Sequence, residues 1–180
     1  MSMSRTTAVP YAVSDVELAA RGDETAFARL IESYHGDLAR IAFAIVGEHA
    51  TADDAVQSTW VKAWRKLPSL RDSSRFRYWL ISICVNEARQ TVRSHRRVDV
   101  VELSLDQPAA DRSDPAVGVG RIDLHRSLDR LSADDRALLT LRYVADLNAN
   151  EIGAMTGRSA SGTRVRLSRL TAKLREDLTR

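Results

Sequence analysis

Apolar residues recur at intervals of three and four along most of the chain, which is the pattern of amphipathic helices. The longest such stretch covers residues 24–46, between Asp23 as a candidate N-cap and Gly47 as a stop signal. Two further helices are predicted, at residues 51–67, opened by a capping box, and at residues 75–97. No stretch alternates with the period of a strand, so the sequence predicts an all-α fold.

Between residues 98 and 120 the helical pattern gives way to Asp, Pro, Ala and Gly, which is typical of a flexible linker. Helical spacing then resumes, in helices predicted to end near Val144, Met155 and Asp177. The first of these is predicted to be capped by residues 132–135 (Ser-Ala-Asp-Asp) and the second by residues 148–151 (Asn-Ala-Asn-Glu). Val165 counts among the apolar positions of the last one. The predicted organisation is a disordered tail at 1–14, a helical domain at 15–97, an acidic linker at 98–120 and a second helical domain at 121–180.

The distribution of charge says more than its total, because a net charge of +3 is ordinary for 180 residues. Residues 62–97 carry ten lysines and arginines against two acids, and residues 157–180 are basic as well. Residues 98–120 carry five acids against one arginine. Two basic regions separated by an acidic segment favour a nucleic-acid partner.

Composition also excludes several classes of protein. The single cysteine, Cys84, excludes an internal disulfide and any cysteine-built metal or redox site. The four histidines lack metal-ligand spacing, and there is neither a phosphate-binding glycine loop nor a nucleophile elbow. We therefore expect a protein that is not an enzyme and needs no metal or cofactor. Without a signal peptide or a long apolar run, we expect it in the cytoplasm, with no membrane insertion.

The helix predicted at residues 75–97 has a polar stripe whose members step by three and four residues. The stripe consists of Ser82, Asn86, Arg89, Arg93 and Arg96. Its arginines can follow a phosphate backbone, and its asparagine can meet a base edge. Cationic stripes are also common on ordinary solvated faces, and the aromatics Phe76 and Trp79 have the spacing of core residues.

Residues 147–170 have the layout of a helix-turn-helix: a short capped helix, a turn with glycine, and a longer helix. The second helix of this motif enters the major groove with its N-terminal side chains against base edges. The candidates for base contacts are Ser161, Thr163, Arg164 and Arg166, and those for phosphate contacts are Arg158, Arg169 and Lys173. The alternative is a helical hairpin that only packs against its neighbour.

Several segments together carry a family resemblance. They are residues 54–67 (DAVQSTWVKAWRKL), residues 76–88 (FRYWLISICVNEA), and residues 139–143 with 151–153. They closely resemble the extracytoplasmic-function sigma factors of bacterial RNA polymerase, a group of the sigma-70 superfamily, and the likeness covers most of residues 15–177 in order. The resemblance implies that 15–97 is the family's region 2, a helical bundle, and that 121–180 is its region 4, a helix-turn-helix.

The resemblance also implies partners and roles. Region 2 would bind the clamp of the largest subunit of core RNA polymerase through Asp53, Asp54, Gln57 and Lys62. It would also open the promoter at its −10 element and hold a flipped base. The residues implied in that step are Arg75, Phe76, Tyr78, Asn86, Arg89, Arg93 and Arg96. Region 4 would bind the flap of the second-largest subunit and read the −35 element as duplex.

An anti-sigma factor is a further implied partner, because no sensory domain is fused in this sequence. The resemblance places the acidic linker in the polymerase cleft and RNA exit channel, whereas its composition alone also fits a solvated spacer. Two sites depart from the family pattern: Ser58 stands where Glu is common, and residues 161–163 (Ser-Gly-Thr) stand where Gly-Thr-Val is usual. The −35 specificity therefore cannot be transferred from the family.

Two other functions remain open from the residues alone. An autonomous helix-turn-helix regulator would use residues 15–97 only to dimerise, and it would bind duplex DNA without polymerase. A helical adaptor would bind acidic proteins and no DNA. Run-off transcription with core polymerase separates both from a sigma factor, because only a sigma factor makes initiation depend on its addition.

Overall fold

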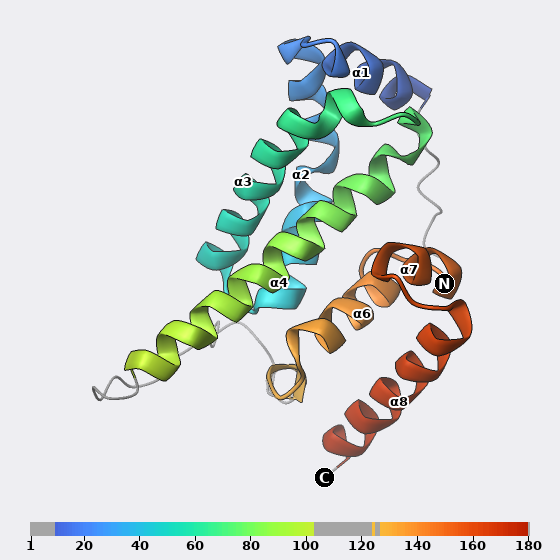
Figure 1. Ribbon diagram of the computed structural model, residues 1–180. Coiled ribbons are helices and arrows are strands. Elements are labelled where there is room, and N and C mark those ends of the chain that lie inside the picture. Colours follow the sequence, from blue (N-terminus) through green and yellow to red (C-terminus); the bar gives the residue numbers. More distant parts are fainter. Residues whose placement is uncertain (1–9, 103–123, 125–126, 180) are drawn as a thin grey trace.

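The computed structural model describes residues 10–102, 124 and 127–179, except the side chains of 10–13 and 95–102. Every regular element in these ranges is a helix, which confirms the all-α class, and the helices form two lobes (Figure 1). The first lobe consists of α1 (Pro10–Ala20), α2 (Glu24–Val46), α3 (His49–Lys66), the 3-10 turns η1 (Leu67–Ser69) and η2 (Ser73–Arg75), and α4 (Phe76–Glu102). The second lobe consists of α6 (Ala133–Tyr143), α7 (Ala149–Thr156) and α8 (Ala160–Leu178).

The first lobe is built around α2, which packs against α1, α3 and α4. The apolar stripe predicted for this helix is buried, with Leu30, Leu38 and Ile41 each at most 1% exposed. Asp23 caps its start by accepting a hydrogen bond from the Ala26 amide at 2.9 Å. Gly47 ends it in the left-handed conformation, at φ 88°, which favours glycine. Both predicted signals are therefore confirmed.

α3 begins earlier than predicted. Its N-cap is Glu48, whose carboxylate accepts a hydrogen bond from the Thr51 amide at 3.2 Å and another from the Thr51 hydroxyl. Thr51 therefore lies inside the first turn, and the prediction that it is the N-cap of a capping box is wrong. Glutamate is not a common N-cap residue, which is why the sequence signal pointed to Thr51.

α1 is an addition to the predicted elements. The sequence predicts a disordered tail over residues 1–14, but the helix begins at Pro10, and residues 1–9 lie outside the described part. Val16 and Ala19 of α1 are buried in the core. Asp15 also accepts a hydrogen bond from the guanidinium of Arg29 in α2 at 2.6 Å. α1 is thus held by contacts with a neighbouring helix, which a short local pattern does not reveal.

Local signals located the helices of the second lobe. Ser132 caps α6, and Asn148 with Glu151 forms a capping box at the start of α7. Gly157, at φ 69°, ends α7 in the left-handed conformation, and α8 follows after a short turn. Helices α7 and α8 are the two helices of the predicted helix-turn-helix, and they pack directly against each other.

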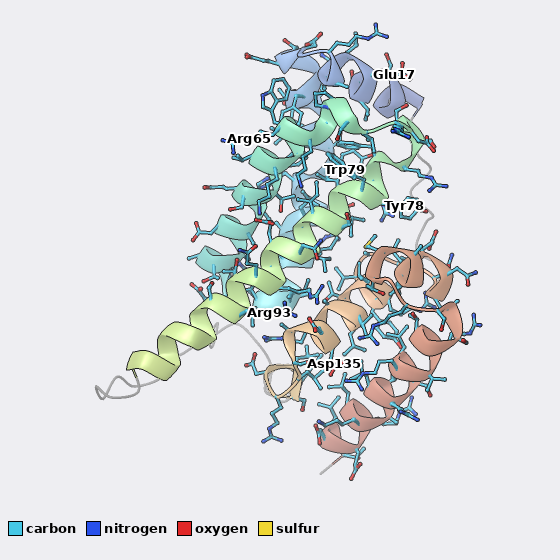
Figure 2. All side chains as sticks on the ribbon, in the orientation of Figure 1. Glu17, Arg65, Tyr78, Trp79, Arg93 and Asp135 are labelled. Carbon is cyan, nitrogen blue, oxygen red and sulfur yellow. The ribbon has the colours of Figure 1, made fainter. Side chains whose placement is uncertain are left out.

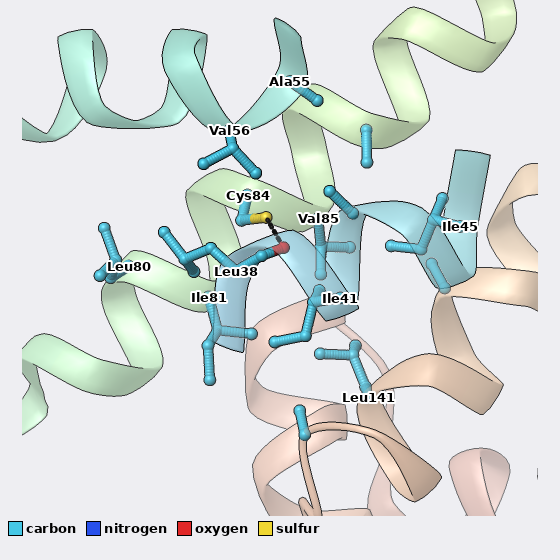
Figure 3. Packing of buried hydrophobic residues seen from close by; sticks show 14 of the residues in the cluster. Leu38, Ile41, Ile45, Ala55, Val56, Leu80, Ile81, Cys84, Val85 and Leu141 are labelled. Atoms are coloured by element: carbon cyan, nitrogen blue, oxygen red, sulfur yellow. Dashed lines mark hydrogen bonds between the residues drawn. The ribbon is translucent and has the colours of Figure 1, made fainter. Parts of the chain in front are cut away.

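One buried core runs through both lobes (Figure 3). Leu38 and Ile41 of α2 pack with Ile81 of α4, and Leu141 of α6 points toward them from the second lobe. Cys84 is buried in the same place, and its thiol donates a hydrogen bond to the Leu38 carbonyl oxygen at 3.6 Å. Burial raises the pKa of this thiol to about 12. The two lobes are therefore in direct contact, through α6 against α2 and α4.

Most of the predicted acidic linker, residues 103–120, lies outside the described residues, and so does its implied path through the polymerase. Residues 98–102 belong to α4, which ends at Glu102 rather than near Arg97 as predicted. The acidic residues at the start of the predicted linker therefore belong to α4 and do not end it.

Gly153 of α7 lies against the turn of the helix-turn-helix. A methyl group at this position would stand 2.7 Å from the Arg158 carbonyl oxygen, which is too close. Gly153→Ala should therefore lower the free energy of unfolding by about 1–3 kcal/mol, measured by urea denaturation. Gly36→Ala, in the interior of α2 where an added methyl meets nothing within 4 Å, should instead raise it by about 1 kcal/mol. Effects of the same sign would contradict this account.

Candidate nucleic-acid interface

The polar stripe of α4 lies on the side of the helix that faces the second lobe (Figure 2). Tyr78, Asn86 and Arg93 are exposed there, and Arg89 is half-buried. Arg96 belongs to the same helix, but its side chain lies outside the described part. The structure thus groups Asn86, Arg89 and Arg93 on one face, as the spacing of the stripe predicts, and Tyr78 lies with them.

Asp134 of α6 binds two arginines of this stripe. Its Oδ1 accepts hydrogen bonds from Arg89 Nε at 2.7 Å and from Arg93 Nη2 at 3.0 Å. Partial burial raises the pKa of the Asp134 carboxyl, but hydrogen bonding and charge from both arginines outweigh burial and hold that pKa below its usual value. The carboxylate engages the two guanidinium groups in the way that a DNA phosphate would.

Two more hydrogen bonds join α4 to the second lobe. The Tyr78 hydroxyl donates to Glu151 Oε1 at 2.9 Å, and this bond raises the pKa of the tyrosine. Arg77 Nη2 donates to the Ala145 carbonyl oxygen at 3.1 Å. Together with Asp134, these contacts mean that α6 and α7 cover part of the face assigned to −10 DNA.

Phe76 does not belong to that face. Its side chain is 2% exposed, and its ring packs edge-on against Tyr34 with centroids 5.5 Å apart. A ring buried in the core cannot stack on a base, so the assignment of Phe76 to −10 DNA is corrected to a packing role. Trp79, its neighbour in the core, is half-buried. Arg75, just before α4, remains exposed.

The candidates for polymerase binding lie on α3. Asp53, Asp54 and Gln57 are exposed along its outer face. Lys62 is turned toward α4 instead, where its Nζ donates to both carboxylate oxygens of Glu87 at 2.6 Å. Lys62 therefore joins α3 to α4, whereas the other three candidates face outward.

The outer face of α3 also contains an apolar residue. Val61 is 51% exposed, and helical spacing places it on the same stripe as Asp54, Ser58 and Arg65, which are exposed as well. Arg65 extends away from the lobe in Figure 2. One exposed valine is ordinary on a protein surface, but an apolar side chain inside a charged and polar rim has the arrangement of a protein interface.

Most −35 candidates are accessible on the second lobe. Arg158, Ser161, Arg164, Arg169 and Lys173 are exposed. Thr163 is fully buried, and its hydroxyl donates to the Ser159 carbonyl oxygen at 3.0 Å. Its assignment to base contacts is therefore corrected: the side chain packs inside the lobe and its hydroxyl bonds its own helix.

Arg166 is bound within the second lobe. Its guanidinium makes two parallel hydrogen bonds to the Asp135 carboxylate, at 2.9 Å from Nε and 2.7 Å from Nη2. Asp135, labelled in Figure 2, has a side chain only 13% exposed. A bidentate pair uses the geometry that arginine needs to read guanine. In this arrangement Arg166 joins α8 to α6, and its guanidinium is not free to make the same two hydrogen bonds to a guanine.

Sequence reasoning missed four residues that the structure brings to these faces. Asp134 and Glu151 are read from sequence only as parts of helix caps, because their partners are more than forty residues away. Val61 was not singled out, and Val165 was counted as apolar packing, although it is 51% exposed. The sequence could have indicated Asp134 and Glu151 through the complementary charges of the two lobes. It could have indicated Val61 and Val165 through their helical spacing, which sets them apart from the buried stripe of each helix.

Within the described ranges, no group of three or more His, Cys, Asp or Glu side chains is placed to hold a metal ion. Among the described helices, none has the length and apolar character of a membrane span.

The fold defines a two-lobed, all-helical protein with a helix-turn-helix in its second lobe. Residues 30–98 match the Sigma-70 region 2 family, and residues 127–176 match the Sigma-70, region 4 family. RNA polymerase sigma factor CarQ from Myxococcus xanthus is 34% identical over 158 residues, which cover 85% of this chain and 87% of CarQ. The chain belongs to the sigma-70 family of RNA polymerase sigma factors, in its extracytoplasmic-function group.

Other relatives agree with this assignment. The probable sigma factor RfaY from Xanthomonas campestris is 30% identical, and the match covers 89% of this chain but only 42% of RfaY. The structure of CnrH in complex with the cytosolic domain of CnrY matches with a TM-score of 0.71 and 28% identity, over 94% of this chain and 97% of CnrH. The sigma factor RpoE in complex with the anti-sigma factor NepR from Bartonella quintana matches with a TM-score of 0.69 and 25% identity, over 85% of this chain and 96% of RpoE.

Proposed function

We propose that this chain is an alternative sigma factor, which binds core RNA polymerase and directs initiation at specific promoters. Residues 15–97 act as region 2 on the −10 element, and residues 121–180 act as region 4 on the −35 element. The observation that carries the proposal is the presence, in one chain and in the family's order, of both lobes with a basic stripe on α4 and an exposed helix α8. The polymerase supplies the chemistry, so the chain itself has no catalytic role.

The −10 strand is held by the α4 stripe. Arg89 and Arg93 contact phosphates, and the exposed side chains of Asn86 and Tyr78 meet an unstacked base. Separated strands expose base edges and faces that a duplex hides. The polar side of a helix binds such exposed bases, whereas a helix that reads a groove needs intact duplex. Arg75, exposed at the start of the helix, extends the basic surface.

DNA binding by α4 requires the second lobe to move. Asp134 occupies Arg89 and Arg93, and Glu151 occupies the Tyr78 hydroxyl, so a DNA strand competes with these acids for the same groups. Exposed ion pairs contribute at most about 1 kcal/mol each, so the apolar contact of α6 with α2 and α4 contributes most to holding the lobes together. We infer that binding to polymerase separates the lobes.

The test of the proposal is run-off transcription. Core polymerase from a bacterium is incubated with promoter fragments, with and without this chain. Initiation that appears only when the chain is added supports the proposal. Specific duplex binding by the free chain, with no change in polymerase start sites, would support an autonomous regulator instead. That alternative is not favoured, because the relatives that match both lobes are sigma factors.

An anti-sigma factor is the proposed regulatory partner. Two solved relatives are the sigma factor CnrH in complex with the CnrY cytosolic domain and the sigma factor RpoE in complex with the anti-sigma factor NepR. The proposed setting is the cytoplasm, where polymerase acts. Copurification from cells tests this partner: a stoichiometric small protein supports it, and recovery of polymerase subunits alone counts against it.

The outer face of α3 is the proposed contact with the polymerase clamp. Val61→Asp should weaken capture of the chain by core polymerase at least tenfold, because a charge would replace the apolar centre of the contact. Pull-down with immobilised core polymerase measures this. Leu18→Asp, which replaces a 38% exposed leucine on α1, is the matched control and should bind normally. Equal losses in both variants would contradict this assignment.

A further inference from the structure

Val165 lies on the outer side of α8. The helix buries Thr163, Leu167 and Leu170, whose directions cluster on one side of the axis. Successive residues of a helix turn by about 100°, so Val165, two positions from both Thr163 and Leu167, points away from the core. Its 51% exposure agrees with that geometry.

The surroundings of Val165 form a small apolar centre with a polar and basic rim. Ser161 and Ser168 precede and follow it on the same outer stripe, and both are exposed. Arg169, four residues after Val165, lies at the edge of that stripe, and Arg158 lies in the turn before α8; both are exposed. Within the described residues neither arginine takes part in an ion pair, so both remain available for phosphates on the walls of a groove.

Folding does not account for a valine at this position. A β-branched residue on an exposed helix face is less favourable than alanine, because its side chain loses rotamer freedom against the preceding turn. A single exposed apolar residue is ordinary by itself. What distinguishes Val165 is its place near the N-terminal end of the second helix of a helix-turn-helix, where side chains meet base edges.

We propose that Val165 determines −35 specificity by contacting the 5-methyl group of a thymine. This rests on the proposed function. Among the four DNA bases, only thymine presents a methyl group in the major groove, and apolar side chains recognise it there. Two other candidates for base readout are otherwise engaged, since Thr163 is buried and Arg166 is bound to Asp135. Ser161 and Arg164 remain exposed candidates, and Val165 is the apolar side chain that stands among them on α8.

The test uses the polymerase holoenzyme formed with the full chain. A promoter is first selected from a library with a randomised −35 element, and each thymine of the selected element is then replaced singly by deoxyuridine, which lacks only the methyl group. One position should lose about fourfold in holoenzyme affinity, the equivalent of the roughly 0.8 kcal/mol that burial of one methyl-sized group contributes. The other thymines should tolerate the change.

The variant Val165→Ala completes the experiment. Alanine has a higher helix propensity than valine, so the variant should fold at least as well as the original chain. It should bind the thymine and deoxyuridine promoters equally at the sensitive position. Val144→Ala, which shortens another exposed valine of the second lobe, is the control and should keep the fourfold difference.

Three results of the promoter measurements would overturn the inference while leaving the proposed function standing. They are a selected −35 element without thymine, tolerance of deoxyuridine at every position, and sensitivity that persists in Val165→Ala. A general loss of polymerase binding by the variant would assign Val165 to a protein contact instead, and this also overturns it. A holoenzyme that selects no promoter would remove the proposed function together with this inference.

Discussion

Replacing Arg89 and Arg93 together by glutamate should abolish promoter opening while leaving capture by core polymerase intact. Both side chains lie on the α4 stripe, and the polymerase candidates lie on the outer face of α3. Two lost phosphate contacts should reduce the salt dependence of promoter binding by about two phosphate equivalents. The two new negative charges should reduce binding by at least a further tenfold. Permanganate footprinting of the melted region and filter binding at several salt concentrations measure these effects.

The control for that variant is Arg21→Glu with Arg40→Glu, which changes the net charge equally at exposed sites on other faces. It should leave opening intact, and loss of opening there would mean that overall charge is responsible. Adding Asp134→Arg to the Arg89 and Arg93 variant places a positive charge on α6 opposite the two new glutamates of α4. Attraction between the lobes is then restored, but attraction between α4 and DNA is not. Recovery of promoter opening in that combination would show that the arginines act only through contact with α6.

Phe76→Ala should lower the free energy of unfolding by about 3–5 kcal/mol and remove most of the folded first lobe at physiological temperature. The reason is burial: the ring is 2% exposed and contacts Tyr34 and Trp79 in the core. Urea denaturation followed by circular dichroism measures the change. The size of this loss separates the packing role that the spacing predicts from the −10 role that the family resemblance implied for this residue.

Tyr78→Ala is the matched comparison, because Tyr78 is an aromatic residue two positions away and 38% exposed. Its removal should cost less than about 1 kcal/mol of stability but should impair promoter opening. If Phe76→Ala left stability unchanged and impaired opening instead, the packing role assigned to Phe76 would be refuted.

Much of the fold follows from local signals in the sequence. The period of apolar residues located α2, α4 and α8, and the caps Asp23, Ser132 and Asn148 mark helix starts where they were predicted. Such signals act within four residues, so they need no knowledge of the rest of the chain. By contrast, α1 depends on contacts with α2, and those are not visible in a local pattern.

The candidate site follows less completely from the sequence. Helical spacing correctly grouped Arg89 and Arg93 on one face, but it could not show that Asp134 lies opposite them, because that contact depends on how the lobes pack. Phe76 has the spacing of a core residue, and its burial confirms that prediction over the role in −10 binding that the family resemblance implied. Thr163 is buried although it was a candidate for base contacts, because the direction of a single polar side chain depends on packing that spacing does not show.

The burial of Cys84 gives the protein a natural reporter of its own unfolding. A thiol with no exposed surface and a pKa of about 12 is almost wholly uncharged at neutral pH and does not meet reagents while α2 and α4 stay packed. Oxidants therefore do not reach this thiol while the first lobe is folded. Because the chain has one cysteine, the rate of thiol labelling measures how often the first lobe opens, without an introduced probe.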